Sequence, residues 1–203
     1  KALFTIKALS SDKAWAGGDW GTLLYTSDGG ATWEDRTYEQ DMMMYCIEFK
    51  GEDKGWIAGE FGTILHTIDG GVTWQPQTTG LGMESTLFSI SFTTPDVGLV
   101  VGIDGLILKT ENGGESWQPK IFEDPDKKPL FEVKILGDIS IAAGDAGKII
   151  LSIDGGNNWS QLPLGTNMGL SWFTGVELFI GPQGTKGIIV GRQSVAVLTE
   201  NDS

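Results

Sequence analysis

Cysteine, histidine and arginine are almost absent from this 203-residue sequence, which has one, one and two of them. A single cysteine, Cys46, excludes an intrachain disulfide, and with His66 as the only histidine a zinc site of the usual kind cannot form. Nucleic acids and anionic lipids bind through many basic side chains, whereas this chain has only Arg36 and Arg192, scattered lysines and a net charge of −13. We therefore expect no nucleic-acid partner, no metal and no other cofactor.

Long apolar runs and helical periodicity are missing as well. No segment approaches the length that spans a bilayer, so direct membrane insertion is not expected. Glycine (30 residues) and tryptophan (8 residues) are instead abundant, a composition that favours short strands and tight turns. The sequence predicts an all-β protein with almost no helix and with its main loops at residues 79–86, 123–129 and 164–171.

One motif recurs along the chain. Four segments share much of the pattern Gly-x-x-Gly-x-Ile/Leu-Leu-x-Thr-x-Asp/Asn-Gly-Gly-x-x-Trp, and their closing tryptophans recur every 41–43 residues. These tryptophans are Trp33, Trp74, Trp117 and Trp159. A fifth, weaker copy occupies residues 191–201 and ends without a tryptophan. A period of this size with strand-like content is typical of the blade of a β-propeller.

Each unit divides into four strands, which in the third unit we place at residues 87–93, 98–102, 106–110 and 116–121. The prediction is a single β-propeller domain over residues 1–203, with about five four-stranded blades of which the fifth is incomplete. The expected blades are residues 1–40, 41–83, 84–127, 128–168 and 169–203. An alternative is that these residues form a segment of a larger ring, since no strand is evident that would close the ring by the usual swap. An open end would expose apolar blade faces.

The motif contains the Asp box, Thr/Ser-x-Asp-x-Gly-x-Thr/Ser-Trp. Its acidic position is occupied by Asp28, Asp69, Asn112 and Asp154. A short carboxylate there can accept hydrogen bonds within its own turn, and the tryptophan can cover the hairpin. Asn112 keeps this structural role but could not act as a catalytic carboxylate. We therefore interpret the four boxes as structural and expect no catalytic residue among them.

At these residues the chain resembles the photosystem II stability/assembly factor family and its relatives in non-photosynthetic bacteria. The resemblance implies an exported propeller, in the bacterial periplasm or the thylakoid lumen, that helps to assemble a membrane complex without doing chemistry. We take the start of the chain at Lys1, directly before a strand-like run, as a processed start compatible with export. Family members typically have seven blades, and photosynthetic members carry an arginine-rich patch that binds the reaction-centre precursor. Two arginines cannot form that patch, which favours a bacterial relative serving another membrane or exported complex.

The loops between the second and third strands are the candidate partner-binding region. In propellers these loops lie on the face opposite the Asp boxes. The candidate residues are Asp19, Trp20, Glu60, Phe61, Asp104, Asp145 and Arg192. Acidic groups beside exposed aromatic rings suit a protein partner, because aromatics anchor a contact and charges select for it. The alternative is that Trp20 and Phe61 only fill space between adjacent blades.

The main alternative function is a sialidase-like glycoside hydrolase or a carbohydrate-binding Asp-box propeller. Sialidases hold the carboxylate of their substrate with three arginines, one more than this chain contains. Their nucleophile is a tyrosine paired with a glutamate, and none of Tyr25, Tyr38 and Tyr45 has an evident partner in the sequence. The sequence therefore favours a non-catalytic scaffold that binds proteins.

Overall fold

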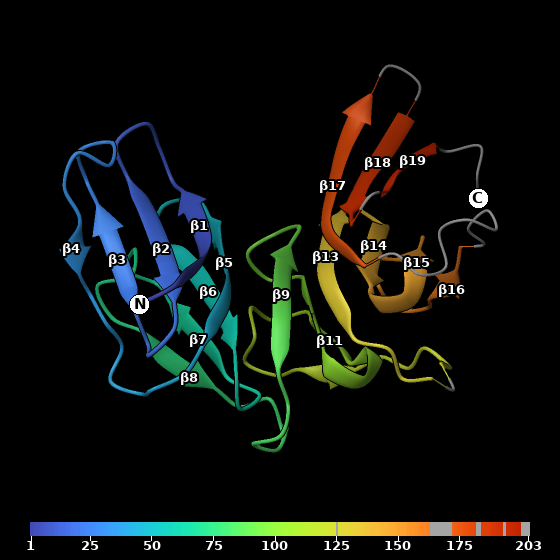
Figure 1. The fold of residues 1–203 in the computed structure, drawn as a ribbon, viewed down its shortest axis with the longest axis horizontal. Coiled ribbons are helices and arrows are strands. Elements are labelled where there is room, and N and C mark those ends of the chain that lie inside the picture. Colours follow the sequence, from blue (N-terminus) through green and yellow to red (C-terminus); the bar gives the residue numbers. More distant parts are fainter. Residues whose placement is uncertain (125, 163–171, 182–183, 193, 200–203) are drawn as a thin grey trace.

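The chain folds into five antiparallel β-sheets that follow one another in sequence (Figure 1). The computed structural model describes residues 1–124, 126–162, 172–181, 184–192 and 194–199. Within each sheet the strands pair in chain order, so each sheet is an up-and-down meander. The predicted loop at 164–171 lies outside the described residues.

The first two sheets have four strands each. The first sheet contains β1 (Leu3–Ala8), β2 (Ala14–Gly18), β3 (Leu23–Thr26) and β4 (Glu34–Asp35). The second sheet contains β5 (Met44–Lys50), β6 (Lys54–Gly59), β7 (Ile64–Thr67) and β8 (Gln75–Gln77).

The third and fourth sheets repeat this arrangement. The third sheet contains β9 (Leu87–Phe92), β10 (Gly98–Gly102), β11 (Ile107–Thr110) and β12 (Gln118–Pro119). The fourth sheet contains β13 (Leu130–Leu136), β14 (Ile139–Gly144), β15 (Ile149–Ser152) and β16 (Ser160–Gln161). A short 3₁₀ turn follows the second strand of both sheets, η1 (Ile103–Gly105) and η2 (Asp145–Gly147).

The fifth sheet has three strands in the part of the chain that the structure describes. They are β17 (Phe173–Gly181), β18 (Gly184–Gly191) and β19 (Ser194–Thr199). The prediction of an all-β propeller with five blades and an incomplete fifth blade is thus confirmed. One detail was wrong: the fourth strand of the third blade was expected at 116–121, but β12 begins only after Trp117 and is two residues long. The reason is that the backbone N–H of Ser116 still belongs to the Asp-box turn and donates to Asn112.

The hydrophobic core lies between the blades rather than inside any one sheet. The innermost strands β1, β5, β9, β13 and β17 lie side by side, and one apolar cluster fills each junction between neighbouring blades. In the first junction Trp15 is fully buried and packs edge-on to Trp74 of the next blade. A side chain on Gly71, which has φ +89°, would collide with the Trp15 ring. The second glycine of the Asp box is therefore needed for close packing as well as for the turn.

The connection between the first two blades contributes to the same core. Met42 and Met44 are buried and Met43 is exposed, so packing under the loop accounts for two of the three methionines. Cys46 is a half-buried free thiol whose pKa is raised to about 11, chiefly by desolvation of its sulfur. A thiol in this state is an inert packing residue rather than a nucleophile.

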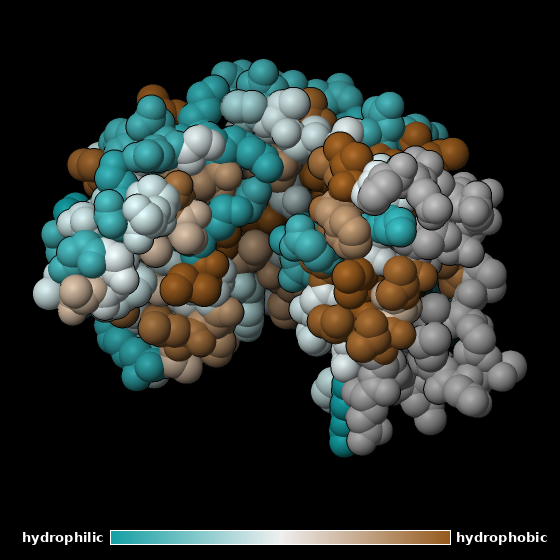
Figure 2. Space-filling view, turned by 90° about the horizontal axis from the view of Figure 1, so that it is seen from above, coloured by the Kyte–Doolittle hydropathy of each residue, from teal (hydrophilic) through white to brown (hydrophobic). Residues whose placement is uncertain are grey.

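The two end blades expose apolar surface that is buried in the middle blades. Ile6 on β1 is 67% exposed, whereas its repeat equivalents Ile47 and Ile90 are buried against the preceding blade. On the fifth sheet Val195 and Val197 are exposed in the same way. Figure 2 shows the five blades as an arc around an open hollow, with hydrophobic side chains gathered at both ends.

The Asp-box tryptophans allow a test of this packing. Trp117 is 8% exposed and its indole N–H donates to Gln77 of the preceding blade, at 3.1 Å, whereas Trp33, in the first blade of the described residues, is 39% exposed. We expect Trp117→Ala to lower the free energy of unfolding by about 3–5 kcal/mol and Trp33→Ala by roughly 1 kcal/mol or less. Urea unfolding of both variants measures the difference. Equal losses would contradict the view that the cost arises at the junction between blades.

Candidate partner-binding face

Four equivalent turns between second and third strands form one end of the blades. In each turn the first residue accepts a backbone hydrogen bond from the fourth, for example Thr22 N–H to Asp19 O at 2.9 Å and Thr63 N–H to Glu60 O at 3.0 Å. Both central residues have positive φ, the signature of a type I′ hairpin turn. The central pairs are Trp20-Gly21, Phe61-Gly62, Asp104-Gly105 and Ala146-Gly147.

The first central residue of each turn is conformationally unusual. Trp20, Phe61, Asp104 and Ala146 have φ between 52° and 59°, a left-handed region that disfavours side chains other than those of glycine, asparagine and aspartate. Holding a bulky aromatic residue there costs on the order of 1 kcal/mol. Backbone strain of this kind is concentrated at functional sites, which makes these turn tips candidates for recognition.

The aromatic side chains at the tips point largely into solvent. Trp20 is 63% exposed and Phe61 is 36% exposed. Trp20 therefore does not act as filler between blades, although Phe61 is partly covered. A large exposed indole on a rigid turn is the kind of group that anchors protein contacts.

Carboxylates without a cationic partner accompany these tips. Among the described residues no ion pair involves Asp19, Glu60, Asp104 or Asp145. Glu60 accepts only the backbone N–H of Met43, at 2.9 Å, and one oxygen of Asp19 is buried without a hydrogen-bond partner. In the fifth blade the predicted residue is Arg192. It is exposed and follows β18 at the position that Asp19, Glu60 and Asp145 occupy in their blades. The predicted residues thus share one end of the blades, acidic in four of them and basic in the fifth.

A set of aromatic residues that the sequence analysis did not single out lies beside these turns. Phe4, Tyr45, Phe88 and Phe131 each occupy a bulge near the start of an innermost strand. Their rings contact one another from blade to blade, with centroids 5.7, 5.3 and 5.4 Å apart. We call these four residues the aromatic arc. Their recurrence every 41–43 residues was the signal that could have found them.

The opposite end of the blades is held by the Asp boxes. Asp69 accepts hydrogen bonds from the Thr67 hydroxyl (2.7 Å) and from the backbone N–H and hydroxyl of Thr73 (2.9 and 2.7 Å). Asp28 and Asp154 make the corresponding bonds in their turns. Asn112 keeps the geometry, but the direction of one hydrogen bond is reversed: its amide donates to the Ser116 hydroxyl at 3.0 Å. These side chains are fully engaged within their own turns.

The tryptophans that close the boxes differ in how much they are covered. Trp117 is buried, and Trp74 and Trp159 are partly buried. Trp74 packs edge-on against Phe49 of its own blade as well as Trp15 of the preceding one. The Trp159 indole donates to the Gly156 carbonyl oxygen at 3.1 Å. The box therefore fixes both the turn and the junction with the preceding blade.

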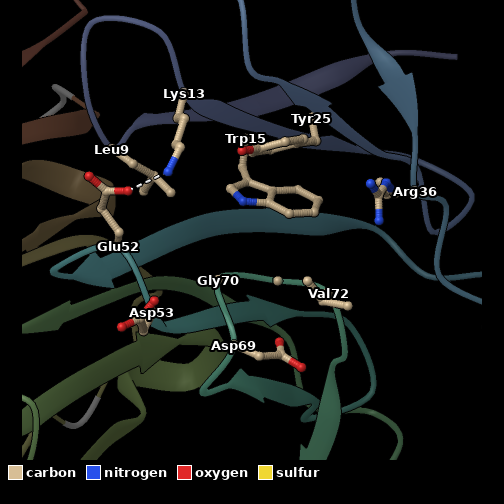
Figure 3. Close-up of a pocket in the computed structure, with 11 residues that line it drawn as sticks. Leu9, Lys13, Trp15, Tyr25, Arg36, Glu52, Asp53, Asp69, Gly70 and Val72 are labelled. Atoms are coloured by element: carbon tan, nitrogen blue, oxygen red, sulfur yellow. Dashed lines mark hydrogen bonds and ion pairs between the residues drawn. The ribbon is translucent and has the colours of Figure 1, made fainter.

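A cavity of about 180 Å³ opens on the Asp-box end between the first two blades (Figure 3). Its carboxylates include Glu52, which pairs with Lys13 at 2.6 Å, and Asp69. Hydrogen bonds, chiefly from Thr73, lower the pKa of Asp69 to about 2. A glycosidase needs a general acid whose pKa is raised, so Asp69 is unsuited to that role.

The described residues include neither a candidate metal-binding cluster nor a candidate membrane-spanning helix. They contain no group of three or more histidine, cysteine, aspartate or glutamate side chains placed to hold a metal ion. No helix within them is long and apolar enough to cross a membrane.

The blade architecture and the four hydrogen-bonded boxes define the class of the molecule, an Asp-box β-propeller. The family model described as Photosynthesis system II assembly factor YCF48 matches residues 1–78 and 75–171. The chain belongs to this family. No curated protein sequence matches it.

Solved structures with the same fold include assembly factors and an enzyme. A structure described as YCF48 bound to D1 peptide is 20% identical, with a TM-score of 0.55 over 96% of this chain and 92% of that one. YCF48 from Cyanidioschyzon merolae is 22% identical, with a TM-score of 0.69, and 92% of this chain covers 64% of it. An ancestral GH74 enzyme is 14% identical, with a TM-score of 0.72 over 92% of this chain and 27% of that one. At these identities the likeness concerns the fold alone.

The Asp boxes predict a pH dependence of stability. Because the folded chain lowers the pKa of Asp69 from its usual 3.8 to about 2, the unfolded chain binds this proton more readily. The stabilisation is complete above pH ~4 and is lost as the pH falls through ~2. We expect Asp69→Asn to stay folded at pH 7, as the box with Asn112 does, and to make the unfolding free energy less steep between pH 4 and pH 2.

The reciprocal variant is the control. Asn112→Asp introduces a fourth carboxylate into an equivalent turn and should make the same pH dependence steeper. Urea unfolding at pH 2, 3, 4 and 7 measures both. Identical profiles for the original chain and the two variants would contradict the assigned hydrogen-bonding role.

Proposed function

We propose that this chain is a non-catalytic, exported β-propeller that binds protein partners and assists the assembly or stability of a membrane-associated complex. The observation that carries the proposal is the exposed Trp20 on a strained type I′ turn, next to unpaired carboxylates. A strained conformation with no packing role persists more readily where the side chain has another use.

Family membership supports the same function. The YCF48 family is described as a photosystem II assembly factor, and one related structure contains a D1 peptide. The client of this chain need not be the same. With two arginines in total the chain has too few of them for an arginine-rich patch. This favours a client other than the photosystem reaction centre.

The proposed absence of catalysis rests on the state of the carboxylates. The Asp-box side chains are held by hydrogen bonds within their own turns, and Asp69 in the cavity has a lowered pKa. A sugar substrate with a carboxylate, such as that of a sialidase, would also find only two arginines in the chain to hold this carboxylate. The likeness to GH74 enzymes at 14% identity extends to the fold and supplies no catalytic pair.

Capture from the native source tests the function. The immobilised chain should retain subunits of one membrane-associated complex from a gently solubilised membrane extract, identified by mass spectrometry. The double variant Asp19→Asn with Trp20→Ala should retain about tenfold less, because an exposed aromatic anchor is worth at least ~1.4 kcal/mol. Its melting temperature should stay within about 4 °C of the original.

Trp33→Ala is the matched control, since it removes a partly exposed tryptophan from the Asp-box end. It should leave capture unchanged. Retention of the same subunits by the double variant, or the absence of any membrane-complex subunit, would contradict the proposal. Cell fractionation tests export separately, and a protein found only in the cytoplasm would refute that part.

A further inference from the structure

The backbone joins the aromatic arc to the acidic turns in every blade that has both. Asp19 N–H donates to the carbonyl oxygen of Ala2 at 3.0 Å, two residues before Phe4. Glu60 N–H donates to Met43 O at 3.1 Å, two residues before Tyr45. The same bonds run from Ile103 to Thr86 and from Asp145 to Pro129, before Phe88 and Phe131. Each arc ring is therefore held close to a turn that carries a carboxylate.

The charge of Glu60 acts directly on the arc. Burial and, second to it, the Glu60 carboxylate raise the pKa of the Tyr45 hydroxyl. The rings are available to a ligand, because Phe4 is 46% exposed and Tyr45, Phe88 and Phe131 are half-buried. Aromatic faces and uncompensated carboxylates therefore lie together on one surface.

The unpaired state of these carboxylates contrasts with three glutamates at the Asp-box end of the blades. Glu34, Glu52 and Glu111 at the Asp-box end all pair with lysine or arginine, at 2.6–2.9 Å. Asp19, Glu60, Asp104 and Asp145 have no such partner among the described residues. A cationic partner would supply the missing charge.

We infer that the aromatic arc and its neighbouring carboxylates bind an extended segment of the partner protein that carries arginine or lysine side chains. This inference rests on the proposed function and specifies the partner for the same face. Cations pack favourably over aromatic faces, and here the carboxylates add complementary charge. Anionic nucleic acids and lipids would meet a repulsive surface.

The length of the arc fits a short stretch of chain. The three centroid separations of 5.3–5.7 Å correspond together to about five residues of extended chain at ~3.3 Å each. The surface formed by the aromatic arc and the carboxylates does not continue onto the fifth blade. There Arg192 N–H makes the equivalent bond to Trp172 O, at 2.9 Å, and Thr174 takes the place of the aromatic ring.

Fluorescence anisotropy with synthetic peptides tests the inference. The probe is a short fluorescein-labelled peptide in which arginines alternate with valine and serine, and its comparison peptide has glutamate in place of every arginine. We expect the full-length chain to bind the arginine peptide at least tenfold more tightly, and to lose most of this affinity between about 0.05 M and about 0.5 M salt. Equal binding of both peptides, or no binding of the arginine peptide, would overturn the inference.

Two matched sets of variants assign the binding to this face. The triple variant Glu60→Gln, Asp104→Asn and Asp145→Asn removes three charges while keeping side-chain size, and should weaken arginine-peptide binding about tenfold. The control triple variant Glu34→Gln, Glu52→Gln and Glu111→Gln removes the same charge from the Asp-box end and should bind as before. Equal weakening in both sets would reduce the effect to net charge and overturn the site.

A further variant separates the arc from general electrostatics. Phe88→Leu keeps the apolar volume but removes a central ring, and should weaken the arginine peptide several-fold with the salt dependence retained. Unchanged affinity would exclude the arc. Preferential binding of the glutamate peptide that depends on Trp20 would refute the cationic partner while leaving the proposed protein-binding function intact.

Discussion

A four-stranded sheet with two apolar faces cannot bury both of them by itself, and every other feature of this molecule depends on that constraint. Each blade uses the next as its cover, so the core consists of a series of junctions. The equivalent tryptophans of the first two blades both pack against the next blade, Trp15 on Gly71 and Trp56 on Phe92 with ring centroids 3.7 Å apart. Close approach of large rings to glycine and to other rings provides dense packing without long side chains.

The division of labour between the two ends of the blades follows from this packing. At the Asp-box end, Asp69 and its equivalents accept hydrogen bonds from residues of their own turns. These bonds fix the hairpin and place the tryptophan at the junction with the preceding blade. At the other end the type I′ turns need only a left-handed backbone, and the side chains at their tips are exposed. Recognition can therefore be assigned to one end while the other maintains the fold.

Local features of the sequence determined how much of this could be predicted. The spacing of Gly-Gly-x-x-Trp was sufficient for the blades, because each motif makes a hairpin whose contacts lie within a few residues. The position of Trp20 and its neighbours on a common end followed from the strand order. The exposed state of Trp33 did not, since an equivalent position in the repeat does not imply an equivalent neighbour. The tryptophans look alike in sequence and differ only in what packs against them.

The aromatic arc illustrates a second limit. Phe4, Tyr45, Phe88 and Phe131 sit at bulges, where the two-residue alternation of a strand is interrupted. Alternation alone assigns such residues to a blade face like any other strand aromatic. Only the register of the pairing places all four at the same level of successive blades, and only coordinates show their rings in contact.

The left-handed tip of the type I′ turn has a consequence for how such a protein can change. Four blades carry tryptophan, phenylalanine, aspartate and alanine at this one position, and all four close with the same hydrogen bond. The scaffold thus tolerates different side chains at this position, at a cost on the order of 1 kcal/mol for a bulky one. Substitutions at the tips can accumulate one blade at a time, so a repeated architecture can acquire a new binding preference combinatorially, without a compensating change in its interior.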